Sequence, residues 1–178
     1  MSRDSTQGYT VGEIKSLLAL TGAEAIIVDG VNLMRGQGES VRVRLQNITR
    51  DLKQVALETG TVIFILAQLN REAAKDAVPS LSNLKESGSL EEDSDIVILL
   101  STVWDENDLR KIQNIPPYML EMPCTGEEFR DIRRARNSLV IGQVAKNRDG
   151  EIGMTQLEFI ASRFGFRELK RKKEDLPF

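Results

Sequence analysis

The chain alternates between segments with helical spacing of apolar residues and short runs that are apolar throughout. Thr10 and Glu13 form the S/T-x-x-E pattern of a capping box, and the apolar residues that follow predict a helix over 10–21. A longer amphipathic segment ends at Gly60, a residue that suits a helix C-terminus, and predicts the most regular helix of the chain. Its apolar positions recur at steps of four and three: Val41, Leu45, Ile48, Leu52 and Val55.

Three short runs are rich in β-branched residues: 25–29, 61–66 and 95–100. Continuous apolar runs are typical of strands buried on both faces, and their alternation with helices favours a parallel sheet covered by helices. The predicted fold class is therefore α/β, with a mostly parallel sheet flanked by helices. Residues 67–94 form a long polar connection, which we expect to carry function at the C-terminal edge of the sheet.

The C-terminal part contains a predicted β-hairpin. Its arms are 138–145 and 154–160, and Asp149 and Gly150 lie in the turn between them. We expect this hairpin to present Lys146 and Arg148 near its tip.

We treat residues 1–178 as a single domain. Two further segments lie outside the alternation of strands and helices. Residues 101–137 contain several prolines and are interpreted as an insertion, in which Thr125 caps a basic helix that extends to about 136. Residues 167–178 form a charged tail that we expect to be frayed.

Composition restricts the chemistry. The chain has no histidine and a single cysteine, Cys124, which excludes an internal disulfide, a cysteine zinc site and histidine-based catalysis. The net charge of −3 means that any contact with nucleic acid must be local. No apolar run is long enough to cross a membrane and no signal peptide is visible, so we expect a cytoplasmic protein.

Polar side chains follow two of the predicted strands. Asp29 ends the first apolar run, as in a Walker B strand, where a carboxylate orients a magnesium-bound water beside nucleotide phosphates. Strand-end aspartates also cap turns, so Asp29 alone leaves both interpretations open. Gln68 follows the next strand, and an amide at that position is able to sense a γ-phosphate.

Four segments extend these signals into an ordered set: DGVNLM (29–34), LAQLNR (66–71), PSLSNLKESGSLEEDSD (79–95) and AKNRDG (145–150). In this order they closely resemble successive motifs in the C-terminal, RecA-like ATPase domain of DnaB-type replicative DNA helicases. The resemblance covers about 10–100 and 138–160. A recombinase or clock-type RecA relative shares the Walker B strand, but it does not explain the third segment.

The resemblance implies roles for four residues at an ATP site. Asp29 matches the Walker B aspartate that serves Mg²⁺, and Gln68 matches the switch glutamine. Lys146 and Arg148 match a basic pair that reaches into the ATP site of the neighbouring subunit, with Arg148 as the arginine finger. A planar, permanently charged guanidinium suits that role because the transition-state charge is spread over several oxygens.

The resemblance also implies a loop for single-stranded DNA that includes Lys85, Glu86 and Gly88 and faces the central channel of a hexamer. The family commonly has arginine where this chain has Lys85, so the grip on phosphate is expected to be weaker. Gly30 and Asn32 also differ from the aromatic residue and the glutamine that usually follow the Walker B aspartate.

The chain contains no G-x-x-x-x-G-K-[ST] phosphate loop. By the resemblance, the general-base glutamate also lies upstream, so we expect neither tight ATP binding nor hydrolysis by this chain alone. The phosphate-loop strand would lie between 61–66 and 95–100. We therefore expect these two strands either to pair with each other or to be completed by another chain.

The predicted function is the C-terminal part of a DnaB-like helicase motor that uses ATP and Mg²⁺ only in a complete assembly. Its expected partners are single-stranded DNA and either further copies in a ring or a chain that carries the phosphate loop. The alternative is a non-enzymatic module that docks on an intact helicase as a regulator.

Overall fold

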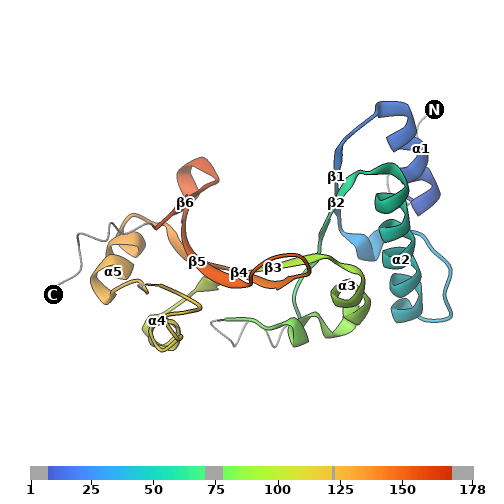
Figure 1. The fold of residues 1–178 in the computed structure, drawn as a ribbon. Helices are drawn as coiled ribbons and strands as arrows, with labels where there is room; N and C mark the ends of the chain where they lie inside the picture. Colours follow the sequence, from blue (N-terminus) through green and yellow to red (C-terminus); the bar gives the residue numbers. More distant parts are fainter. Residues whose placement is uncertain (1–7, 71–77, 122, 170–178) are drawn as a thin grey trace. The chain divides into compact units, whose positions relative to one another are not determined.

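The computed structural model describes residues 8–70, 78–121 and 123–169, and within them the chain forms two compact units (Figure 1). Unit 1 holds the described residues up to Asn70 together with Leu84–Ser94, and unit 2 holds the others. None of the described helices is both long and apolar enough to cross a membrane. The assignment of 1–178 to a single domain with an insertion stays a prediction.

Unit 1 contains two long helices that begin and end as the sequence predicts. The helix after Thr10 starts with a complete capping box, in which Thr10 and Glu13 satisfy each other's backbone N–H groups. Gly22 and Gly60 end the two helices with φ angles of 62° and 67°, where a side chain would be strained. The elements of the unit are α1 (Val11–Thr21), β1 (Ala25–Asp29), η1 (Val31–Leu33), α2 (Val41–Thr59), β2 (Val62–Leu66) and α3 (Gly88–Asp93).

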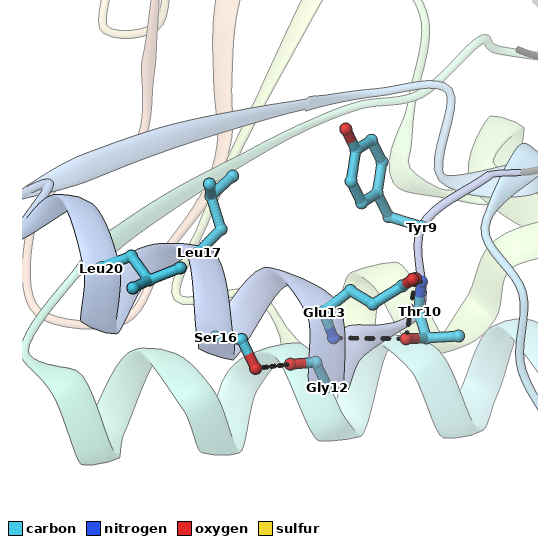
Figure 2. A pocket seen from close by; sticks show the side chains of 7 residues that line it. All are labelled: Tyr9, Thr10, Gly12, Glu13, Ser16, Leu17 and Leu20. Carbon is cyan, nitrogen blue, oxygen red and sulfur yellow. Dashed lines mark hydrogen bonds between the residues drawn. The ribbon is translucent and has the colours of Figure 1, made fainter. Parts of the chain in front are cut away.

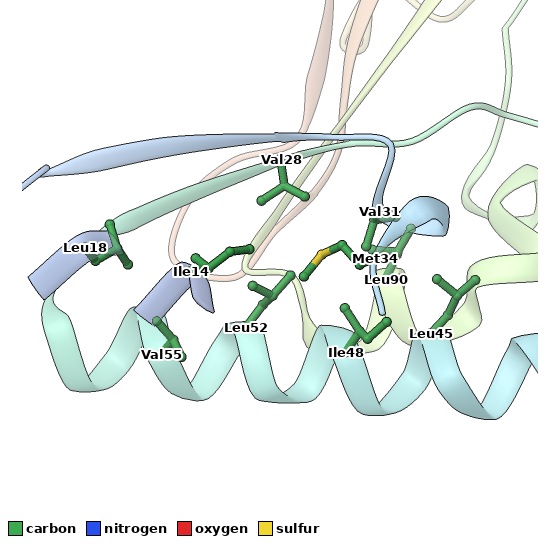
Figure 3. Packing of buried hydrophobic residues seen from close by; sticks show 10 residues of the cluster. All are labelled: Ile14, Leu18, Val28, Val31, Met34, Leu45, Ile48, Leu52, Val55 and Leu90. Carbon is green, nitrogen blue, oxygen red and sulfur yellow. The ribbon is translucent and has the colours of Figure 1, made fainter. Parts of the chain in front are cut away.

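The strands β1 and β2 pair in parallel, as predicted, with Ala25 opposite Val62 and Asp29 opposite Leu66. One face of this pair packs on α1 and α2. Figure 3 shows the apolar side chains that meet there, with Val28 of β1 above residues of both helices. The buried cluster consists of Ile14, Leu18, Val28, Val31, Met34, Leu45, Ile48, Leu52, Val55 and Leu90.

The opposite face of the β1–β2 pair is apolar and exposed. Ile27 is 70% exposed, and Val62, Phe64 and Leu66 are 53–55% exposed. Parallel strands are normally covered on both faces, so this open face is unusual.

Unit 2 is built on an antiparallel sheet. Within the described residues its strand order is β3-β4-β5-β6, so the hairpin around Asp149 and Gly150 is confirmed. The third apolar run was expected in the parallel sheet, but β3 instead pairs along its length with β4, where Val103 lies opposite Leu139. β2 and β3 belong to different sheets, so these two strands do not pair with each other, and the alternative, completion by another chain, stays a prediction. The strands are β3 (Ile96–Val103), β4 (Ser138–Asn147), β5 (Gly153–Ile160) and β6 (Gly165–Glu168).

Two of the predicted boundaries therefore shift. Residues 101–103, assigned to the insertion, belong to β3, and the first residues of the predicted tail, Arg167 and Glu168, belong to β6. Residues 170–178 of the tail lie outside the described residues. Thr125 caps a helix as predicted, although that helix ends at Arg134.

The core of unit 2 lies between this sheet and the helices α4 (Glu106–Gln113) and α5 (Gly126–Arg134). Two polar side chains of β5 are buried on the same face. The carboxamide of Gln156 accepts the backbone N–H of Cys124 at 2.6 Å, and the carboxylate of Glu158 accepts from Asn137 at 2.6 Å and pairs with Arg167. The apolar part of the cluster consists of Val103, Leu109, Ile112, Leu120, Cys124, Phe129, Ile132, Leu139 and Ile141.

Candidate functional site

Asp29 stands at the carboxyl end of β1, where its side chain is exposed. The chain turns immediately after it, because Gly30 adopts a φ angle of 75° that other residues rarely take. Val31 and Met34 then insert into the core and are 1% and 5% exposed. The carboxylate is therefore carried by a strand that is fixed just before and just after it.

Gln68 lies two residues beyond the end of β2 and is also exposed. Because Asp29 is opposite Leu66 in a parallel register, both polar side chains follow the carboxyl ends of neighbouring strands. This sheet edge is where ligands bind in open α/β folds. The structure thus brings Asp29 and Gln68 to one edge of unit 1.

At this edge Asp29 offers a carboxylate and Gln68 a carboxamide. No group of three acidic, histidine or cysteine side chains that could hold a metal occurs among the described residues. Mg²⁺ needs no such group, since it usually keeps several waters and takes one or two carboxylates together with substrate phosphates. Asp29 is a carboxylate of that kind.

Lys146 and Arg148 lie in unit 2, at the end of β4 and in the turn that follows it. Lys146 is half-buried and Arg148 is exposed. The guanidinium Nη1 of Arg148 lies 3.1 Å from the carboxylate Oδ1 of Asp95. Sequence reasoning did not assign a role to Asp95, because the two residues are far apart along the chain and nothing local marks the pair.

The predicted DNA loop is only partly described. The backbone of Lys85, Glu86 and Gly88 lies in η3 (Leu81–Ser87) and α3, but their side chains lie outside the described residues, so their role stays a prediction. The end of α3 is fixed within unit 1, since the hydroxyl of Thr49 donates to Asp93 at 2.6 Å.

An open hollow of about 530 Å³ runs along α1 (Figure 2). Its polar groups are already engaged, since Thr10 and Glu13 form the capping box, Glu13 also pairs with Arg35, and the hydroxyl of Ser16 donates to the carbonyl of Gly12. None of the predicted site residues lines it; the lining residues are Tyr9, Thr10, Gly12, Glu13, Ser16, Leu17 and Leu20.

Comparison with solved structures supports the fold. A solved ATPase domain superposes with a TM-score of 0.68 at 27% identity, covering 92% of this chain and 52% of that one. A DnaB-like replicative helicase, solved in a study of its interactions with primase, gives the same TM-score at 28% identity and is covered over 36% of its length.

Sequence comparison gives the family. The replicative DNA helicase DnaC of Bacillus subtilis is 29% identical over 97% of this chain, and the replicative DNA helicase DnaB of Geobacillus stearothermophilus is 28% identical over the same share. The chain spans 35% of the length of each of these relatives. The family model for the DnaB-like helicase C-terminal domain matches residues 4–168, and the chain belongs to that family.

Proposed function

We propose that this chain is the C-terminal part of a DnaB-like replicative helicase motor that couples ATP hydrolysis to movement on single-stranded DNA. In this proposal Asp29 serves Mg²⁺, Gln68 senses the γ-phosphate, and the loop with Lys85, Glu86 and Gly88 binds DNA. The chain is not competent for ATP hydrolysis alone, because it lacks a phosphate loop.

The parallel register of β1 and β2 carries the proposal. A carboxylate and an amide that follow adjacent parallel strands are able to approach the same phosphate group from one side. The carboxylate would orient a water bound to the Mg²⁺ of the nucleotide, and the amide, a neutral donor and acceptor, would contact oxygens of the γ-phosphate. Both side chains are exposed at the edge, so neither has to leave the core to act.

In the same proposal Arg148 and Lys146, which lie at the hairpin of unit 2, act on the nucleotide of another subunit. An arginine finger acts on the nucleotide of a neighbouring subunit, so the motor has to be an oligomer. Hexameric ring formation and a segment that carries the phosphate loop are therefore part of the proposed working state.

The decisive experiment mixes the purified chain with a polypeptide that supplies the phosphate-loop half of such a domain and measures ATP hydrolysis. We expect turnover only in the mixture, a near-complete loss with Asp29→Asn, and a loss of about 10³-fold or more with Arg148→Ala. Glu24→Gln is the matched control, since Glu24 is an exposed carboxylate immediately before the strand that ends at Asp29.

Two outcomes would contradict the proposal. ATP turnover by the chain alone would show that its nucleotide site is complete. Failure to stimulate the phosphate-loop half, combined with inhibition of an intact helicase hexamer, would support the alternative of a docking regulator.

A further inference from the structure

Asp95 holds Arg148 through two contacts. The backbone N–H of Arg148 donates to the carbonyl of Asp95 at 2.9 Å, and the Nη1 atom of Arg148 donates to the Asp95 carboxylate at 3.1 Å. The two residues are 53 positions apart and join the start of β3 to the end of β4. The pair is therefore part of the sheet architecture of unit 2.

The backbone contact extends the β3–β4 ladder by one step beyond the pairing of Ile96 with Asn147. It fixes the Cα atom of Arg148 at the first position of the turn. The side-chain contact then selects one direction for a guanidinium that is otherwise on an exposed loop, with about half of each side chain in solvent. Long arginine side chains lose much rotamer entropy when they are fixed, so a prior contact lowers the cost of using the group.

The contact also leaves the guanidinium suited to bind an anion. Arginine has five N–H donors in a planar fork, so a carboxylate that accepts from Nη1 orients the plane without exhausting the donors. A half-exposed ion pair of this kind is weak enough to adjust when phosphate oxygens approach.

We infer that Asp95 is a positioning residue that sets the direction of Arg148 for its action on nucleotide phosphates, an inference that rests on the proposed role of Arg148. Asp95 is also the last residue of the segment 79–95 that contains the predicted DNA loop. The residue that ends this segment is thus the one whose carboxylate contacts the guanidinium of Arg148.

The first test uses the purified 178-residue chain and needs no activity. Arginine side-chain ¹⁵N NMR measures the order of the Arg148 Nε–H group, which is assigned by its loss in Arg148→Ala. We expect a clear fall in order with Asp95→Ala, partial recovery with Asp95→Glu, and no change with Glu151→Gln, an exposed carboxylate in the same turn. An Arg148 signal that is equally ordered in Asp95→Ala would overturn the inference.

The second test measures ATP hydrolysis in the completed assembly as a double-mutant cycle. We expect Asp95→Ala to lower kcat by up to about 5-fold with little change in KM, to have no further effect in the Arg148→Ala background, and to be rescued in part by Asp95→Glu. If Arg148→Ala is harmless, the proposed role of Arg148 fails. If Arg148→Ala is damaging but Asp95→Ala is harmless, or is equally damaging with and without Arg148, only the positioning role fails.

Discussion

The two units have the same layout, a sheet with helices on one face, but they bury different kinds of side chain there. In unit 1 the inward residues of β1 and β2 are apolar, and Val28 belongs to the same buried cluster as Ile14 of α1 and Leu52 of α2. In unit 2 the inward face also contains Gln156 and Glu158, which are 5% and 4% exposed. Unit 1 is therefore stabilised mainly by apolar burial, whereas unit 2 also depends on a buried polar network.

The largest expected effect tests whether the units are stabilised separately. Leu52 of α2 is 1% exposed and Leu139 of β4 is fully buried, so replacing either with alanine should cost about 2–5 kcal/mol of unfolding free energy. Amide hydrogen exchange should show the loss for Leu52→Ala in unit 1 and that for Leu139→Ala in unit 2. Leu57→Ala is the matched control, because Leu57 lies on the same helix as Leu52 and is 67% exposed. Equal loss of protection in both units would mean that they unfold as one body.

The next effect concerns one carboxylate from each unit. Burial by itself raises the pKa of Glu158, but hydrogen bonds from Asn137 and Arg167, with the charges of Arg167 and Arg163, outweigh it and lower the pKa. In unit 1 a hydrogen bond from Lys15, then one from Gln54 and the charge of Lys15, lower the pKa of Glu58. The directions agree, but Glu58 is on the surface and Glu158 is in the core.

Both carboxylates favour folding above the unfolded glutamate pKa of about 4.3, and this stabilisation is lost as the pH falls through the lower folded value. Glu158→Gln should reduce the unfolding free energy of unit 2 at pH 7 by about 1–3 kcal/mol and flatten its loss of stability in acid. Glu58→Gln should have a much smaller effect that disappears in 1 M salt, since solvent and ions screen an exposed pair. Denaturant unfolding between pH 3 and 7 measures both, and a strong salt dependence for Glu158 would contradict its assignment to the core.

Sequence patterns were most informative where a signal is local. The period of α2, its end at Gly60 and the position of Asp29 after a β-branched run all follow from neighbouring residues. The parallel pairing of β1 with β2 follows from the same runs. These features fix the sheet edge with Asp29 and Gln68, so that part of the candidate site was predictable.

Long-range pairing was not predictable in the same way. A continuous apolar run does not show whether its partner is parallel or antiparallel, so the run 95–100 did not reveal that β3 pairs with β4 in an antiparallel direction. In β5 the apolar Leu157 and Phe159 are only half-buried, while the charged Glu158 between them is buried because Asn137 and Arg167 satisfy it. The contact of Asp95 with Arg148 joins residues that share no local motif.

Substitutions on the open faces of the two sheets are expected to change stability least. They offer a further comparison between the two units. Phe64 is 53% exposed on a parallel pair, and Ile98 is 61% exposed on an antiparallel sheet. Replacing either with serine should change the unfolding free energy by no more than about 0.5 kcal/mol, because neither side chain is part of a core.

The same two serine substitutions should differ from each other in their effect on self-association. Both open faces are apolar, since Ile96, Ile98 and Leu100 of β3 are 52–61% exposed, but an antiparallel sheet can keep one face in water whereas parallel strands are normally covered on both faces. Sedimentation equilibrium should therefore show concentration-dependent association that is weakened by Phe64→Ser, less affected by Ile98→Ser, and unchanged by Leu57→Ser on the outer side of α2. A chain that stays monomeric at all concentrations would mean that the free edges and open face of β1 and β2 are stable in water, which would remove the reason to expect that another chain completes them.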